Sequence, residues 1–222
     1  MKKGFTELVF ILDRSGSMYG LEQDTIGGFN SMLEKQRTQE GDVVVTTVLF
    51  NNDVEVLHER IPLEAVRPMT HSDYHVYGCT ALLDAVGNAI HKTINVQKSM
   101  EKQYRAEKVI FVIITDGMEN SSREYSYHHI KNLIEKQKKK YSWEFIFLGA
   151  NIDAVEEAAK MGIGEDRSVT YFNDSEGVQL NYEVIGSTVA KMRAVSKMSA
   201  VGREWKEKIE KNHEKREDKV CH

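Results

Sequence analysis

The chain has 222 residues, of which 41% are hydrophobic and 29% are charged, and its formal net charge is −4 at pH 7. This composition is typical of a folded globular protein, and the length suits one α/β domain with a large core. The negative charge argues against general affinity for nucleic acids, because proteins that bind them usually carry a basic excess or a basic stripe.

The cysteines and the apolar runs predict a cytoplasmic protein. Two cysteines, Cys79 and Cys221, are too few for a disulfide framework and do not have a metal-binding spacing. The N-terminal apolar run, residues 8–12, is shorter than the core of a signal peptide. No stretch approaches the roughly 20 apolar residues that span a bilayer, so we expect no association with a membrane.

The first strongly apolar segment leads directly into a cluster of oxygen-bearing side chains. Residues 8–12 (LVFIL) predict a strand buried on both faces of a parallel sheet. Asp13, Ser15 and Ser17 follow at alternate positions, in the loop at the carboxyl end of this strand. Open α/β sheets bind their ligands at that end. One carboxylate and two hydroxyls are hard oxygen ligands, so this loop predicts a magnesium or manganese site.

The next residues predict a helix and then a hairpin. Residues 21–36 have apolar side chains at helical spacing, and Gly27-Gly28 within them suggests close packing on the sheet. Residues 43–50 and 54–61 predict two strands joined by a turn. We expect the second of these strands to be antiparallel and to lie at an edge of the sheet. A long connection, residues 62–78, leads to a helix that starts near Thr80.

A second buried strand also ends in a carboxylate, because residues 109–114 (VIFVII) are followed by Thr115, Asp116 and Gly117. Further apolar patterns predict helices at residues 125–139, 153–161 and 178–195, and strands at residues 145–148 and 168–172. Strands and helices alternate nearly throughout. This alternation predicts a doubly wound, three-layer α/β sandwich with a mainly parallel central sheet and one antiparallel edge strand.

The C-terminal residues differ in composition from the rest of the chain. Residues 203–219 are mostly charged, with Trp205 and Ile209 as their large apolar side chains. We therefore divide the chain into a domain, residues 1–200, and a charged tail, residues 201–222, which we expect to bury little of its own surface. The tail is either a solvated segment that frays or a helix that docks on a partner through Trp205.

Three fragments are expected at the same edge of the sheet. They are DRSGS at residues 13–17, GCTALLDA at residues 78–85 and TDG at residues 115–117. In this order, each at the proper end of its element, they resemble the metal-ion-dependent adhesion site of von Willebrand factor A domains. The resemblance covers residues 6–195. The segments DYHVYGCTALLDAVGNAI and TDGMENSSREYSY are similar to those of small stand-alone bacterial members of that family.

This resemblance implies the von Willebrand factor A fold and a bound divalent metal, Mg²⁺ or Mn²⁺. It makes Ser15 and Ser17 direct hydroxyl ligands, and Thr80 a third hydroxyl ligand, either direct or through water. Asp13 and Asp116 would hold the ion or its waters and orient the hydroxyls. In the family, an aspartate or glutamate of a protein partner fills the remaining position on the metal. The resemblance therefore implies a metal-dependent protein-binding module and not an enzyme.

Other interpretations of these residues stay open. Ser15, Ser17 and Thr80 are also suitable helix caps. Asp13 would alternatively be the nucleophile of a magnesium-dependent phosphotransferase, although such enzymes place a second aspartate two residues on, where this chain has Ser15. A third interpretation keeps the von Willebrand factor A fold but places the partner-binding surface away from the metal.

Several polar residues near these fragments have weaker signals. His71, Asp73 and His75 lie at alternate positions, which is not a recognised zinc-binding spacing, so we expect them to be solvated. Glu119 and Asn120 are expected to be polar surface residues, with contact to a partner or water as the alternative. Cys79 is expected to be a small buried residue.

Overall fold

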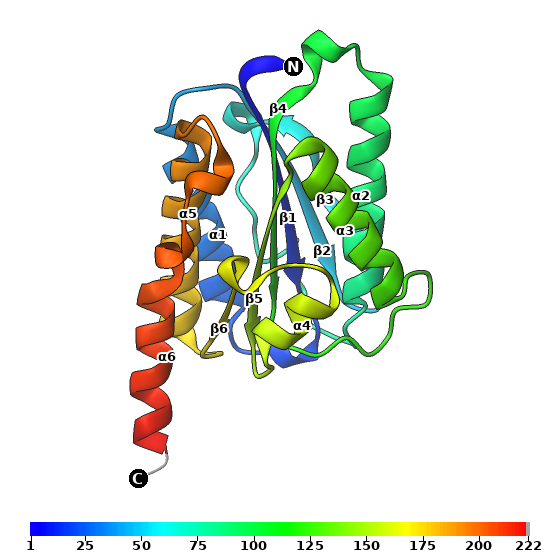
Figure 1. Cartoon of the computed structure of the whole chain (residues 1–222). Helices are drawn as coiled ribbons and strands as arrows, with labels where there is room; N and C mark the ends of the chain where they lie inside the picture. The colour runs from blue at the N-terminus through cyan, green and yellow to red at the C-terminus, as the bar shows by residue number, and fades with distance from the viewer. Residues whose placement is uncertain (221–222) are drawn as a thin grey trace.

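Residues 1–220, the part of the chain that the computed structural model describes, fold around a central sheet of six strands with helices on both faces (Figure 1). In chain order the elements are β1 (Lys2–Asp13), α1 (Glu22–Arg37), β2 (Val43–Phe50), β3 (Val54–Pro62), α2 (Leu82–Ser99), β4 (Ala106–Thr115), α3 (Tyr127–Tyr141), β5 (Glu144–Ala150), α4 (Ala154–Lys160), β6 (Ser168–Tyr171), α5 (Ser175–Ala194) and α6 (Glu207–Val220). Within these residues, no helix combines the length and hydrophobicity needed to cross a membrane.

The strand order is β3-β2-β1-β4-β5-β6, and this confirms the predicted doubly wound architecture. β1 pairs in parallel with both β2 and β4, and the antiparallel strand is β3, at the edge. β1 is longer than expected, because it begins at Lys2 and ends with Asp13. The sequence pattern showed only the continuous apolar run of β1, because its first three residues are exposed and Thr6 and Glu7 are polar although they are buried.

Side chains of the central strands alternate between two apolar cores. Leu8, Phe10 and Leu12 face α1 and α5, whereas Val9 and Ile11 face α2 and α3. All five are at most 1% exposed. Burial of this apolar surface, at about 25 cal/mol per Å², is the main stabilising contribution to such a sheet. It holds the carboxyl ends of β1 and β4 next to each other, at the lower edge of the sheet in Figure 1.

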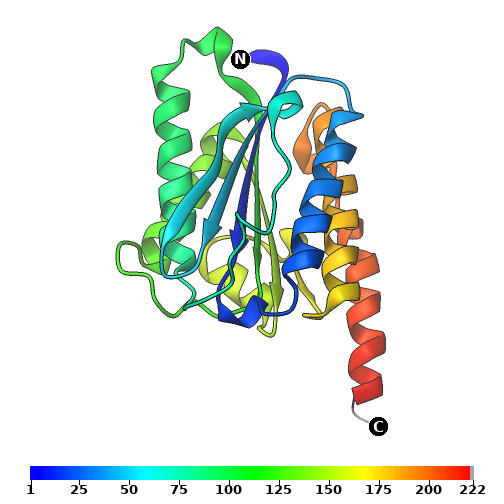
Figure 2. The same ribbon diagram turned by 180° about the vertical axis from the view of Figure 1, so that it is seen from behind.

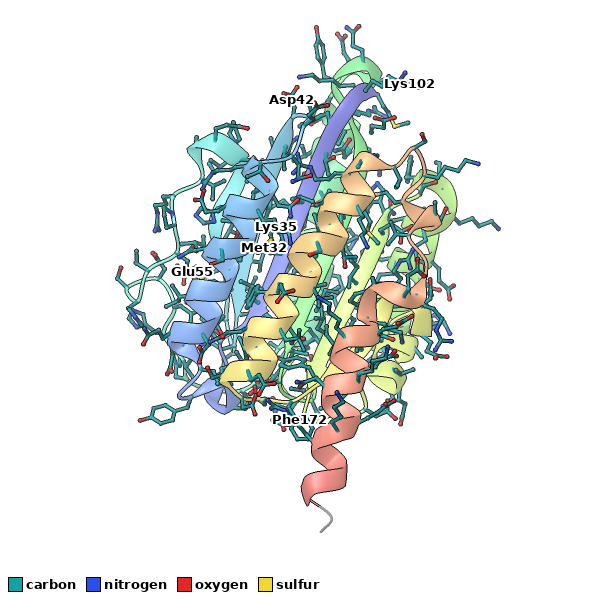
Figure 3. All side chains as sticks on the ribbon, turned by 90° about the vertical axis from the view of Figure 1, so that its left-hand side faces the viewer. Met32, Lys35, Asp42, Glu55, Lys102 and Phe172 are labelled. Atoms are coloured by element: carbon teal, nitrogen blue, oxygen red, sulfur yellow. The ribbon has the colours of Figure 1, made fainter. Side chains whose placement is uncertain are left out.

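Helices α1 and α5 lie side by side on one face of the sheet (Figures 2 and 3). A glycine of α1 lies at their contact. A Cβ atom at Gly28 would lie only 2.3 Å from Cδ2 of Tyr182 on α5, so a larger residue would displace that ring. Further along α1, Met32 and Lys35 lie against Gly186 of α5. The expected close packing at Gly27-Gly28 therefore occurs at Gly28, but against α5 and not against the sheet.

The C-terminal segment packs on the domain in a way that its composition did not predict. Trp205, Lys206 and Ile209 are each at most 5% exposed, so the expectation that this segment buries little of its own surface is wrong at these positions. The indole Nε1 of Trp205 donates to the carbonyl of Asp166 at 2.8 Å, and Nζ of Lys206 donates to the carbonyl of Ser168 at 3.0 Å. α6 then runs past the carboxyl edge of the sheet (Figures 1 and 2). The boundary at residue 201 stays a prediction, and Cys221 lies outside the described residues.

Candidate metal centre

Three loops meet at the carboxyl edge of β1 and β4, and they carry the five predicted ligands. The loop after β1 is joined to the loop after β4, because the hydroxyl of Ser17 donates to Oδ1 of Asp116 at 2.6 Å. The hydroxyls of Ser15 and Ser17 share a hydrogen bond of 3.2 Å. Ser15 also donates its backbone N–H to Oδ1 of Asp13 at 2.7 Å. The structure therefore links Asp13, Ser15, Ser17 and Asp116 in one hydrogen-bonded chain.

Thr80 reaches the same place from the segment before α2. A Cβ atom built on Gly117 would lie 3.1 Å from Oγ1 of Thr80 and 3.5 Å from Oγ of Ser17. Both hydroxyls therefore lie next to the position that a side chain at residue 117 would occupy. Because Gly117 has no side chain, this position is open. Thr80 is 3% exposed and Ser17 is solvent-exposed, so the cluster is reached from solvent on the side of Ser17.

Asp13 is the last residue of β1 and is 2% exposed. Its Oδ2 accepts a hydrogen bond from the hydroxyl of Thr115 at 2.5 Å, and its backbone carbonyl accepts one from the hydroxyl of Tyr74. Burial raises the pKa of the Asp13 carboxyl to about 6, because the low-dielectric surroundings disfavour its charged form. The hydrogen bonds from Thr115 and Ser15 oppose this rise.

Asp116 follows β4 and is 1% exposed. Its Oδ2 accepts a hydrogen bond from Nδ2 of Asn173 at 2.8 Å. Burial raises the pKa of this carboxyl, and the hydrogen bonds from Ser17 and Asn173 lower it in part. The donors that the structure places on the carboxylates of Asp13 and Asp116 are neutral groups, so a cation would complete the charge balance of the site.

The guanidinium of Arg14 does not supply the positive charge that would balance Asp13 and Asp116, although Arg14 lies next to Asp13. Its Nη1 is 2.7 Å from Oε2 of Glu55, on the hairpin strand β3. The position of Glu55 at the side of the molecule is shown in Figure 3.

The conformation of the segment before α2 requires a glycine at position 78. Gly78 has a φ of +79°, which favours glycine, and a Cβ atom there would lie 2.0 Å from Oδ1 of Asn52. That same oxygen accepts the backbone N–H of Cys79 at 2.9 Å, and the carbonyl of Gly78 accepts the N–H of Gly16 at 3.0 Å. The ligand loop after β1, the hairpin turn and the segment before Thr80 are therefore tied together by these two hydrogen bonds. Cys79 itself is exposed, so the expectation that it is buried is wrong.

Glu119 and Asn120 hold the third loop against the start of α2. The side-chain carbonyl of Asn120 accepts the backbone N–H of Thr80 at 2.9 Å. The backbone N–H of Asn120 donates to the backbone carbonyl of Thr80 at 3.1 Å. Glu119 accepts the N–H of Leu83 at 2.9 Å, within the first turn of α2. These two residues therefore have a structural role, and they are more than the polar surface residues expected from the sequence.

The helix-capping interpretation of the hydroxyls is not supported by the structure. The residue that precedes α2 is Ala81, and Ser15, before the short 3-10 helix at Gly16–Met18, makes no capping hydrogen bond with its side chain. α1 is preceded by Leu21. The hydroxyls of Ser15 and Ser17 instead share a hydrogen bond, and those of Ser17 and Thr80 both lie near Gly117.

Sequence reasoning missed Tyr74 and Asn173 as neighbours of the site, and it placed Thr115 there without predicting its hydrogen bond to Asp13. Thr115 is the last residue of β4, and Asn173 follows the end of β6 by two residues. A search for polar residues at the carboxyl edge of the sheet would therefore have found both. Asn173 is held by α6, because the ring of Phe172 packs on that of His213 at 4.7 Å and Arg216 pairs with both Asp174 and Glu176. Phe172 lies beside α6 in Figure 3.

The donor set fits a hard divalent cation. It consists of carboxylate and hydroxyl oxygens, which Mg²⁺ and Mn²⁺ prefer. Among the described residues, no group of three His, Cys, Asp and Glu side chains is arranged to hold a metal. Asp73 instead pairs with the guanidinium of Arg67 in two contacts of 2.7 Å, so His71, Asp73 and His75 do not form a second site.

Comparison with known proteins shows the fold. No family model and no curated protein matches the sequence. Among solved structures, proximal thread matrix protein 1 from the mussel byssus is 15% identical over 84% of this chain and 46% of its own, with a TM-score of 0.58. A von Willebrand factor type A protein from Catenulispora acidiphila is 14% identical over 83% and 42%, with a TM-score of 0.55. Manganese-loaded TRAP of Plasmodium vivax is 14% identical over 81% and 73%, with a TM-score of 0.53.

These similarities establish the architecture of the chain. It has the α/β fold of von Willebrand factor A domains, with a mostly parallel sheet and one antiparallel edge strand. The chain spans less than half the length of the mussel and Catenulispora proteins that it matches. A further structure of the mussel protein has a zinc-occupied adhesion-site motif.

Proposed function

We propose that this chain is a divalent-metal-dependent protein-binding module with an intact metal-ion-dependent adhesion site. The observation that carries this proposal is the meeting of two buried carboxylates, Asp13 and Asp116, with three hydroxyls, two from the loop after β1 and one from the segment before α2. The zinc-occupied motif of the mussel protein and the manganese-loaded TRAP protein support it by analogy of fold.

Each residue has a defined part in this proposal. Ser15, Ser17 and Thr80 provide neutral oxygens, whereas Asp13 and Asp116 provide the negative charge that balances a bound Mg²⁺ or Mn²⁺. Thr115 and Asn173 hold the two carboxylates in orientation. A divalent cation held by mostly neutral ligands stays electrophilic, so it would bind the carboxylate of an aspartate or glutamate on a protein partner.

An enzymatic role for Asp13 has less support. A phosphotransferase of this kind needs a nucleophilic carboxylate that faces the substrate and a second acid two residues on. Both oxygens of Asp13 already accept hydrogen bonds from Ser15 and Thr115, and the side chain is buried.

Titration calorimetry of the metal-stripped protein with Mg²⁺ and Mn²⁺ tests the proposal. We expect binding by the wild type and none by Asp13→Ala or Asp116→Ala, because each substitution removes half of the negative charge. Circular dichroism should show both variants folded, since loss of a buried carboxylate also removes its desolvation cost. Asp42→Ala, at the opposite edge of the sheet (Figure 3), is the matched control and should bind as wild type.

Wild-type affinity in either site variant would contradict the metal assignment. Metal binding that has no effect on partner capture, compared with and without chelator, would favour the interpretation in which the partner surface lies away from the metal.

A further inference from the structure

Each of the three loops that carry the candidate ligands also exposes one large apolar side chain. Tyr19 follows Ser17 by two residues and is 82% exposed, and Met118 follows Asp116 by two residues and is 63% exposed. Tyr77 precedes Thr80 by three residues and is 50% exposed. Because the ligands of these loops meet, the three exposed residues lie on segments that border the same site. We call Tyr19, Tyr77 and Met118 the apolar rim.

The rim accounts for much of the large apolar surface that the protein exposes. In the described part of the chain, the other strongly exposed large apolar residues are Met1, Val56, Tyr104 and Tyr141. None of these four belongs to a ligand loop, and Met1, Tyr104 and Tyr141 lie toward the amino ends of the parallel strands. Apolar side chains gathered around a polar site are typical of an interaction surface, where aromatic residues and methionine are enriched.

Backbone hydrogen bonds hold two of the three rim residues, Tyr77 and Tyr19, in their loops. The N–H of Tyr77 donates to the carbonyl of Arg14 at 3.1 Å, and the Arg14 guanidinium lies 6.0 Å from the centre of the Tyr77 ring. The N–H of Tyr19 donates to the carbonyl of Gly16 at 3.3 Å, and the preceding Met18 is buried. A partner therefore loses little free energy to ordering of these loops, which favours their use as anchors.

We infer that the metal site binds a protein segment whose acidic residue is flanked, within about two positions, by bulky apolar side chains that pack on Tyr19, Tyr77 and Met118. This inference rests on the proposed function, in which the acidic residue binds the metal. Tyrosines contribute large contact area with few rotatable bonds, and methionine adapts to different apolar shapes. The metal would then select the carboxylate, and the rim would select its neighbours.

Peptide display on the full chain tests this inference. A library of random peptides is selected against the immobilised protein in Mg²⁺, and bound peptides are released with EDTA. We expect the released peptides to share an aspartate or glutamate with an aromatic or aliphatic residue within two positions. A synthetic peptide from this pool should bind about tenfold more weakly to Tyr19→Ser or Tyr77→Ser, which is the effect of an anchor residue worth about 1.4 kcal/mol.

Two controls separate docking from support of the metal site. The rim variants should bind Mg²⁺ with wild-type affinity in calorimetry, because none of the three side chains is a proposed ligand. Tyr104→Ser, which replaces a tyrosine of comparable exposure outside the ligand loops, should leave peptide affinity unchanged.

The outcomes distinguish failure of the rim from failure of the metal site. Peptides released by EDTA that share an acid but no apolar neighbour would overturn the rim and leave the proposed function standing. Selected peptides that EDTA does not release would overturn the proposed function and the rim together. Enrichment of no peptide, or loss of Mg²⁺ affinity in the rim variants, would also overturn the docking role of these residues.

Discussion

Each carboxylate of the proposed metal site is held by donors from distant parts of the chain, and only some of these donors can be predicted. Asp13 and Asp116 end or follow strongly apolar strands, so their place at the carboxyl edge follows from the sequence. Tyr74 and Asn173 reach these residues from 61 and 57 positions away. Such contacts depend on how a long connection and a late loop pack, and no spacing in the sequence encodes that.

Gly117 lets the role of Thr80 be tested without removing a ligand. A methyl group at Gly117 would lie 3.1 Å from Oγ1 of Thr80, which is close enough to displace that hydroxyl. We therefore expect Gly117→Ala to weaken Mg²⁺ binding about tenfold, the size of effect seen when the support of a metal ligand is disturbed. Calorimetry measures the affinity, and thermal unfolding should show little change in stability.

The control for this substitution is Gly27→Ala in α1. A Cβ atom at Gly27 has no neighbour within 4 Å, so this variant should keep wild-type Mg²⁺ affinity and gain up to about 1 kcal/mol of helix stability. Unchanged Mg²⁺ affinity in Gly117→Ala would mean that metal binding does not depend on the exact position of the Thr80 hydroxyl.

At the scale of the element, apolar periodicity predicts where helices and strands lie but not how polar segments pack. Predicted β2, residues 43–50, has the observed boundaries, because both of its ends are marked by polar turn residues. The packing of residues 203–209, at and just before the start of α6, does not follow from their mostly charged composition, which indicates a solvated segment. Lys206 is buried because its Nζ donates to the carbonyl of Ser168 and lies 2.9 Å from Oε1 of Glu210. In the sequence, a buried lysine whose ammonium group is hydrogen-bonded and ion-paired in this way cannot be distinguished from a solvated lysine.

α6 should influence metal binding through Asn173. Arg216 on α6 pairs with Asp174 and Glu176, on either side of the start of α5, and so holds the loop that places Asn173 on Asp116. We expect Asn173→Ala to weaken Mg²⁺ binding about tenfold. Arg216→Ala should weaken it less, and the double variant should bind no more weakly than Asn173→Ala alone, because the two residues act along one path. Calorimetry on the three variants measures this cycle.

Lys211→Ala is the matched control on the same helix. The Lys211 side chain is 68% exposed and its ion pair is with Glu207, within α6. This variant should bind Mg²⁺ as wild type. Additive losses in Arg216→Ala and Asn173→Ala would mean that α6 acts on the site by another route or on overall stability.

At the scale of the whole molecule, buried titratable groups give the stability opposite dependences on pH. Asp13 has its pKa raised to about 6 by burial, so the metal-free folded state binds a proton that the unfolded state does not bind, and this group favours folding as pH falls through 6. His58 has the opposite effect. It is 3% exposed, and burial, with a smaller contribution from the charge of Arg67, lowers its pKa below the ordinary value of 6.5.

His58 joins the edge hairpin to α1, because its Nδ1 shares a 3.0 Å hydrogen bond with Oγ1 of Thr47 and its ring stacks on Phe29 at 6.4 Å. Below pH 6.5 the unfolded chain takes up a proton at His58 that the folded protein resists, so the free energy of unfolding falls as pH decreases. Each unit between the two pKa values is worth about 1.4 kcal/mol.

Urea unfolding of the metal-free protein at pH 7.5 and pH 5.5, with wild type beside His58→Gln, isolates this contribution. The raised pKa of Asp13 affects both proteins equally, so the difference between them reports His58 alone. We expect wild type to lose stability relative to His58→Gln on going to pH 5.5. An equal change in both proteins would mean that the imidazole is protonated as readily in the folded protein as in the unfolded chain, and that the contact between β3 and α1 opens to admit the charge.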